Sequence, residues 1–184
     1  MAALVRLGNF LGVLGVTLVL LIGFGLQFWL NELPCPLCML QRVAFVLCGL
    51  GFLLNLRFGP QPVYFGITLL AGLFGAAASG RQVLLHIVPG SGAYGDPILG
   101  LHFYTWALVL FLVIVAGTAV LLVLSGRGAP TPERDDAFGV PSRIAAYLLI
   151  AVTLANAVGS FVQCGPIECP DNPTGYWLLQ RFGR

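Results

Sequence analysis

The chain has 184 residues, of which 58% are hydrophobic and 9% are charged, and its formal net charge is +2. Soluble domains carry about 25% charged residues, so this composition excludes an ordinary soluble protein and indicates an integral membrane protein. The small net charge gives no sign of a nucleic-acid partner.

Five apolar stretches match the length of a membrane-spanning helix, which takes about 20 residues. They run over about 9–30, 38–56, 63–85, 102–124 and 144–162. Segments rich in Gly and Pro, or in polar residues, separate most of them. We therefore expect an all-α, polytopic membrane helix bundle that forms a single membrane domain over 1–184.

The first stretch has an alternative interpretation as a cleaved signal peptide. Its apolar run continues without a charge from Arg6 to Glu32, and no small-residue cleavage site follows it. We expect an uncleaved helix that serves as its own targeting signal.

The second stretch contains an arginine close to its start. Only 14 uncharged residues lie between Arg42 and Arg57, too few to cross a hydrocarbon core of about 30 Å. The helix must therefore include 38–41, which leaves Arg42 about one turn inside. An Arg there either reaches back to the interface or meets a buried anionic partner, and both interpretations stay open.

The orientation follows weakly from the arginines and more strongly from the cysteines. With the N-terminus inside, the inner side carries one Arg more than the outer side. The same topology brings Cys35, Cys38, Cys164 and Cys169 to the outer side, which is the oxidising side in bacteria. We expect a cytoplasmic N-terminus and a periplasmic C-terminus.

Cys35 and Cys38 form a Cys-x-x-Cys pair at the mouth of the second stretch, between stiffening prolines. The start of a helix stabilises a thiolate at Cys38, and Arg42 lies one turn later on the same face. These features indicate a redox-active pair. A metal knuckle is the alternative.

Cys164 and Cys169 enclose a Gly-Pro turn, so the two can bond to each other. On the same membrane face as Cys35 and Cys38, they favour a relay by thiol–disulfide exchange within a redox tail over 163–184. A structural staple, or one Cys₄ zinc site made of all four, remains open. Cys48, in the middle of its helix, is expected to act as a small apolar residue.

Three further ionisable residues lie at the outer ends of helices. Arg81 and His86 are expected at the depth of Arg42, and His102 at the start of the fourth stretch. Ionisable residues in a membrane are functional candidates, although His also occurs in ordinary interfacial belts. Arg42, Arg81 and His86 are the candidates for binding a ligand.

The segment Pro34-Cys-Pro-Leu-Cys-Met-Leu-Gln-Arg42, placed between two spans, resembles the signature of the bacterial disulfide bond formation protein B family. The resemblance covers about the first half of the chain. It implies a four-helix core and a membrane thiol:quinone oxidoreductase of the bacterial inner membrane. Such an enzyme reoxidises a periplasmic thioredoxin-like thiol oxidase and passes electrons to ubiquinone or menaquinone.

By this resemblance Cys38 contacts the quinone, Cys35 exchanges with the second pair, Arg42 binds the quinone, and His86 lies near it. One departure is clear, because the family carries its second pair between the third and fourth helices. Here that pair follows a fifth helix, which indicates a five-helix variant.

A vitamin K epoxide reductase-like redox protein is an alternative interpretation of the chain, and the Cys-x-x-Cys-x-x-x-Arg motif early in the sequence argues against it. A non-enzymatic membrane protein with zinc or structural disulfides is another.

Overall fold

The computed structural model describes residues 2–29, 33–88, 90, 92, 97–126, 138–167, 169 and 175–182. The helices are α1 (Ala2–Trp29), α2 (Pro36–Phe58), α3 (Pro62–Leu85), α4 (Phe103–Ser125), α5 (Val140–Cys164) and the short α6 (Trp177–Phe182). Five of them, α1 to α5, are long and apolar enough to cross a membrane. The expected multi-pass helix bundle is therefore confirmed.

The helices extend beyond the apolar runs that indicated them. α1 begins at Ala2 rather than near residue 9, and α5 covers Val140–Cys164 rather than 144–162. Helical backbone hydrogen bonds continue beyond the apolar run at either end, until residues that favour a helix terminus are reached. At the start of α5 these residues are Gly139 at the N-cap and Pro141 in the first turn.

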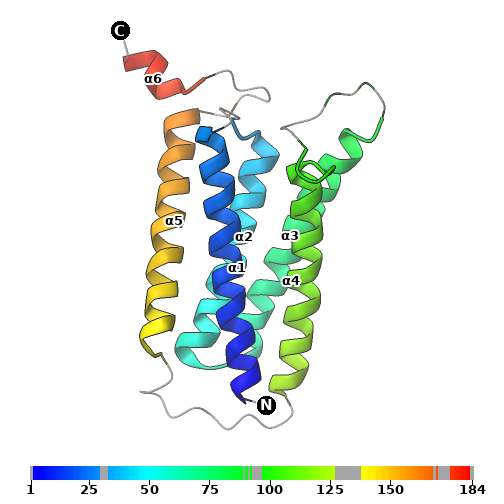
Figure 1. Cartoon of the computed structure of the whole chain (residues 1–184), viewed down its shortest axis with the longest axis vertical. Helices are drawn as coiled ribbons and strands as arrows, with labels where there is room; N and C mark the ends of the chain where they lie inside the picture. Colours follow the sequence, from blue (N-terminus) through cyan, green and yellow to red (C-terminus); the bar gives the residue numbers. More distant parts are fainter. Residues whose placement is uncertain are drawn as a thin grey trace.

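Four helices form the core of the bundle, and the fifth lies against one side. α1 contacts α2 and α4, and α3 contacts the same two helices, so α1 to α4 close a ring. α5 packs against α1 and α2 from outside this ring (Figure 1). The expected four-helix core with an additional transmembrane helix is thus present.

The centre of the bundle is packed with aromatic and aliphatic side chains. The rings of Phe45 on α2 and Phe111 on α4 stack at a centroid distance of 4.0 Å, and Phe111 is fully buried. Gly75 on α3 lies directly against the Phe111 ring, where a Cβ atom would collide with it. A small residue here lets α3 and α4 approach closely, as helices in membranes commonly do.

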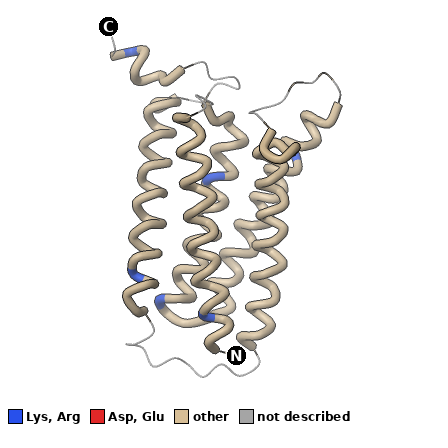
Figure 2. The backbone as a smooth tube through the Cα atoms, in the orientation of Figure 1, with Lys and Arg blue, Asp and Glu red and all other residues tan. Residues whose placement is uncertain are grey.

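The described arginines are divided between the two halves of the bundle (Figure 2). Arg6 near the start of α1, Arg57 in the last turn of α2 and Arg143 in the first turn of α5 lie at the end that carries the N-terminus (Figure 2). The helix α6 lies at the opposite end of the bundle, next to the end of α5, and α2 and α4 both begin at this end (Figure 1). All seven acidic residues of the sequence fall outside the described residues.

Candidate active site

The Cys35–Cys38 disulfide lies at the first turn of α2. The pair is bonded with a Cα–Cα distance of 5.0 Å. Cys35 is the N-cap residue, Pro36 follows it at the first helical position, and the Cys38 backbone N–H donates to Cys35 Sγ at 3.2 Å. The helix start thus fixes both sulfurs. Cys35 is buried, whereas Cys38 is half-buried.

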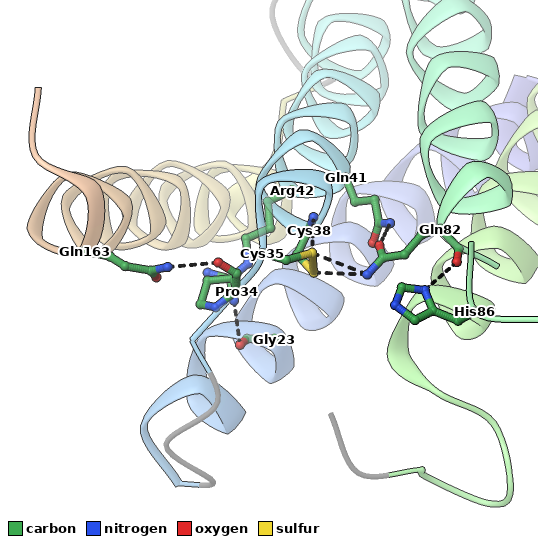
Figure 3. The surroundings of a disulfide bond; sticks show 9 residues. All are labelled: Gly23, Pro34, Cys35, Cys38, Gln41, Arg42, Gln82, His86 and Gln163. Carbon is green, nitrogen blue, oxygen red and sulfur yellow. Dashed lines mark hydrogen bonds between the residues drawn. A yellow bond between two sulfur atoms is a disulfide. The ribbon is translucent and has the colours of Figure 1, made fainter. Parts of the chain in front are cut away.

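One glutamine side chain contacts this disulfide, and a second glutamine holds the first. Gln82 on α3 donates from Nε2 to Cys35 Sγ at 3.3 Å and to Cys38 Sγ at 3.6 Å. Its Oε1 accepts a hydrogen bond from Gln41 Nε2 at 2.8 Å (Figure 3). Both amides are buried, so the disulfide meets oriented polar groups inside an otherwise apolar bundle.

Arg42 lies one turn beyond Cys38 and is held by neutral oxygens. Its Nη1 donates to Gln27 Oε1 at 2.9 Å and to Asn156 Oδ1 at 3.1 Å, and its Nη2 donates to the Gly23 carbonyl at 3.0 Å. These partners come from α1 and α5. We expected Arg42 either to reach back to the interface or to meet a buried anionic partner, and the described contacts match neither. The guanidinium stays inside the bundle, where amide and carbonyl oxygens accept its hydrogen bonds.

The Arg42 network extends to the tail. Gln27 Nε2 donates to the Tyr176 hydroxyl at 3.3 Å, and the Tyr176 ring stacks on Phe28 at 6.3 Å. The segment after α5 therefore contacts α1 beside the group that holds Arg42.

A pocket of about 540 Å³ opens between α1 and α4, against the start of α2. Cys38 and Arg42 both line it, together with the amides of Gln27, Gln41 and Gln82. The rest of the lining is largely apolar or aromatic, from Val19, Leu20, Ile22, Gly23, Leu26, Leu33, Pro34, Phe45, Ile98, Leu99, Phe103, Tyr104, Trp106, Ala107 and Leu110. Cys35 is not among the lining residues, so the two sulfurs of the pair differ in their access to this space.

The second pair lies at the end of α5. Cys164 is its last residue and is bonded to Cys169, with a Cα–Cα distance of 4.9 Å. Trp177 packs over Gly165, whose φ of 65° suits glycine at this turn. Gln163, directly before Cys164, donates from Nε2 to the Pro34 carbonyl at 2.8 Å (Figure 3). This hydrogen bond joins the residue before one disulfide to the residue before the other.

The remaining candidates lie around the pocket rather than in it. Arg81 is exposed and does not line the pocket. His86 ends α3, where its Nδ1 lies 2.8 Å from the Gln82 carbonyl oxygen. The rings of His86 and His102 stack with the lining residue Tyr104 at 5.3 and 5.4 Å. Cys48 is buried and forms no disulfide, and its Sγ lies 3.7 Å from the Thr68 carbonyl oxygen.

The sequence interpretation missed the uncharged polar residues of this site. Gln27, Gln41, Gln82, Asn156 and Gln163 are all buried within spans. The available signal was their presence in apolar helices, where an amide needs a partner on a neighbouring helix. Periodicity alone does not reveal which amides meet.

Comparisons with known proteins agree with this arrangement. Residues 5–93 match the family described as Disulfide bond formation protein DsbB, which covers α1 to α3 and the Cys35–Cys38 motif. No solved structure is significantly similar to the chain.

Several curated relatives carry the same description. Disulfide bond formation protein B of Nitrosomonas eutropha is 41% identical over 71 residues, which is 35% of this chain and 44% of that protein. That of Cupriavidus metallidurans is 29% identical over 129 residues, 53% of this chain and 80% of the relative. Disulfide bond formation protein B 1 of Pseudomonas fluorescens is 28% identical over 149 residues, 60% and 88% of the two chains. The first of these matches thus spans less than half of its relative. The chain is thus similar to the disulfide bond formation protein B family, most closely over its first half, where the Cys35–Cys38 motif lies.

Proposed function

We propose that the chain is a membrane thiol:quinone oxidoreductase. It would reoxidise a periplasmic thioredoxin-like thiol oxidase and pass the electrons to ubiquinone or menaquinone. The observation that carries the proposal is that Cys38, one half of a disulfide, and the cation of Arg42 line the same largely apolar pocket. The similarity of residues 5–93 to a family named for disulfide bond formation adds support.

The residues of the pocket fit a quinone. Its volume of about 540 Å³ falls within the roughly 300–1,000 Å³ of small-molecule sites. The described hydrogen bonds of Arg42 use three N–H groups of the five on a guanidinium, so donors remain for a carbonyl oxygen. Arg42 would hold that oxygen while Cys38 faces the ring, and the apolar lining would exclude water. When bound, the quinone supplies an acceptor for two electrons and two protons.

The chain's own residues would act in a series of thiol–disulfide exchanges. A thiolate of the partner attacks one sulfur of Cys164–Cys169, and the other sulfur leaves as a thiolate. That thiolate attacks Cys35 Sγ, and Cys38 leaves with the bonding electron pair on the pocket side. The hydrogen bond from Gln163 to the Pro34 carbonyl supports exchange between the two pairs, because it holds the two cysteine segments close together. The second thiolate of the partner then attacks the partner's mixed disulfide, which releases the oxidised partner and frees the outer cysteine. That cysteine re-forms Cys164–Cys169 and frees Cys35. When Cys35 and Cys38 then form their disulfide again, two electrons and two protons have passed from the partner's dithiol to the acceptor.

The proposed location is the bacterial inner membrane, with a cytoplasmic N-terminus and a periplasmic C-terminus. Both disulfides lie at the end of the bundle opposite the N-terminus, at the start of α2 and the end of α5, which supports this orientation. An oxidising compartment is where such disulfides persist.

The test is an assay of quinone reduction by the purified chain, with a reduced thioredoxin-like oxidase as the electron donor. The absorbance of the quinone reports the rate. We expect Cys38→Ser to abolish turnover and Cys48→Ser to leave it unchanged, because Cys48 is a buried free thiol away from the pocket. A Cys38→Ser chain that turns over at the wild-type rate would refute the mechanism. Stoichiometric zinc in a wild-type chain that exchanges no thiols would favour the non-enzymatic alternative.

A further inference from the structure

Gln82 is the side chain that reaches both sulfurs of the inner disulfide. Its Nε2 lies 3.3 Å from Cys35 Sγ and 3.6 Å from Cys38 Sγ. The residue is 1% exposed, so water does not compete for this donor.

The orientation of the Gln82 amide is fixed by a second glutamine. Gln82 Oε1 accepts from Gln41 Nε2 at 2.8 Å, and Gln41 is itself buried. With Gln41 in the orientation that it has in the structure, a Gln82 amide rotated by half a turn would present an oxygen to the sulfurs and a nitrogen to the donor of Gln41, so both contacts would be lost. The network therefore directs the Gln82 N–H group at the disulfide.

The two sulfurs differ in what surrounds them. Cys35 Sγ also accepts from the Cys38 backbone N–H at 3.2 Å and is only 4% exposed. Cys38 is half-buried and lines the pocket, whereas Cys35 is not among the lining residues. A donor shared between both sulfurs can follow the negative charge to whichever sulfur carries it.

We propose that Gln82 is a catalytic residue that stabilises the thiolate released from Cys38, an assignment that rests on the proposed function. In that step a thiolate of the outer pair forms a bond to Cys35 Sγ. The Cys35–Cys38 bond breaks, and Cys38 departs with its electron pair. No proton is transferred, so the leaving sulfur carries a full negative charge. A more stable leaving thiolate departs faster, and hydrogen bonds to charged groups are stronger than those to neutral ones.

The experiment measures the Cys38 thiolate without quinone or partner. The full-length chain is reduced with dithiothreitol, cleared of reductant and treated with iodoacetamide, and modified Cys38 is quantified by mass spectrometry. Gln82→Met keeps the length of the side chain and removes the donor. Ser79→Ala is the matched control, because Ser79 is equally buried one turn earlier on α3 and its hydroxyl has no hydrogen-bond partner among the described residues.

We expect Gln82→Met to slow alkylation at pH 7 about three- to fourfold. Loss of a charge-assisted hydrogen bond leaves roughly tenfold less thiolate, and the higher nucleophilicity of a more basic thiolate offsets part of this. At pH 10 the difference should disappear or reverse, because the thiol is then largely ionised in both chains. Ser79→Ala should follow the wild type at both pH values.

Two results would overturn the proposal. One is equal alkylation rates of Cys38 in the wild type and in Gln82→Met at pH 7. The other is a Gln82→Met rate that is as far below the wild-type rate at pH 10 as at pH 7, because that result indicates altered access of iodoacetamide to Cys38. Where Gln82→Met does not fold, Gln82→Glu replaces it, since its carboxyl oxygen still accepts from Gln41. A carboxylate beside the thiolate should slow alkylation at pH 7 at least as much, and an unchanged rate would again overturn the proposal. A different outcome would refute the proposed function alone. In that outcome the wild-type chain reduces no quinone, but Gln82→Met still slows the alkylation of Cys38 at pH 7.

Discussion

Asn156 links the additional fifth helix to the arginine of the pocket. Its Oδ1 accepts from Arg42 Nη1 at 3.1 Å, and its Nδ2 donates to the Val152 carbonyl at 2.8 Å within α5. Asn156→Leu keeps the side-chain size and removes the acceptor, leaving the Arg42 contacts with Gln27 and Gly23.

The size of the effect follows from the number of contacts that remain. A hydrogen bond to a charged group contributes about 1.5–3 kcal/mol. Because two acceptors still hold the guanidinium, we take the lower end, about 1.5 kcal/mol, which is close to tenfold in affinity. If Arg42 holds a quinone oxygen, looser positioning weakens ground-state binding. We expect KM for quinone to rise about fivefold to tenfold, with kcat changed less than twofold.

The assay is steady-state quinone reduction over a range of quinone concentrations. Asn55→Leu is the matched control: it also removes a buried asparagine, which bonds Asn9 and the Gln61 backbone at the other end of the bundle. Both variants should lose thermal stability, but only Asn156→Leu should raise KM. An unchanged KM for Asn156→Leu, or an equal rise for Asn55→Leu, would refute the reasoning.

Two further predictions test the packing and the connection between the disulfides. Gly75→Ala places a methyl group against the buried Phe111 ring, so overpacking of about 1–3 kcal/mol should lower the thermal unfolding midpoint in detergent. Gly66→Ala on the same helix meets nothing within 4 Å and should not lower it; equal midpoints would contradict this account of α3–α4 packing. Gln163→Ala removes the hydrogen bond to Pro34 and should lower kcat severalfold without changing KM for quinone, the opposite of the Asn156→Leu result. A raised KM with unchanged kcat would argue against a role in exchange.

The sequence by itself determined the class of protein and the positions of its helices. Apolar runs of the required length, with few charges, leave a membrane bundle as the stable arrangement, because backbone groups in lipid must bond internally. The Cys-x-x-Cys motif followed by Arg42 also depended only on local spacing. A helix start places Cys38 and Arg42 on one face whatever surrounds them. The ends of α1 and α5 were less predictable, since helices continue beyond the apolar residues that indicate them.

Only the tertiary structure decided which polar residues meet. Gln82 and Gln41 come from different helices, and Asn156 reaches Arg42 from a helix more than a hundred residues later in the chain. Hydropathy and periodicity describe one helix at a time, so they contain no information on such pairings. The same holds for the pocket, which exists only where α1 and α4 lie beside the start of α2. Helix packing, rather than any local pattern, gives Cys38 access to that pocket and leaves Cys35 outside its lining.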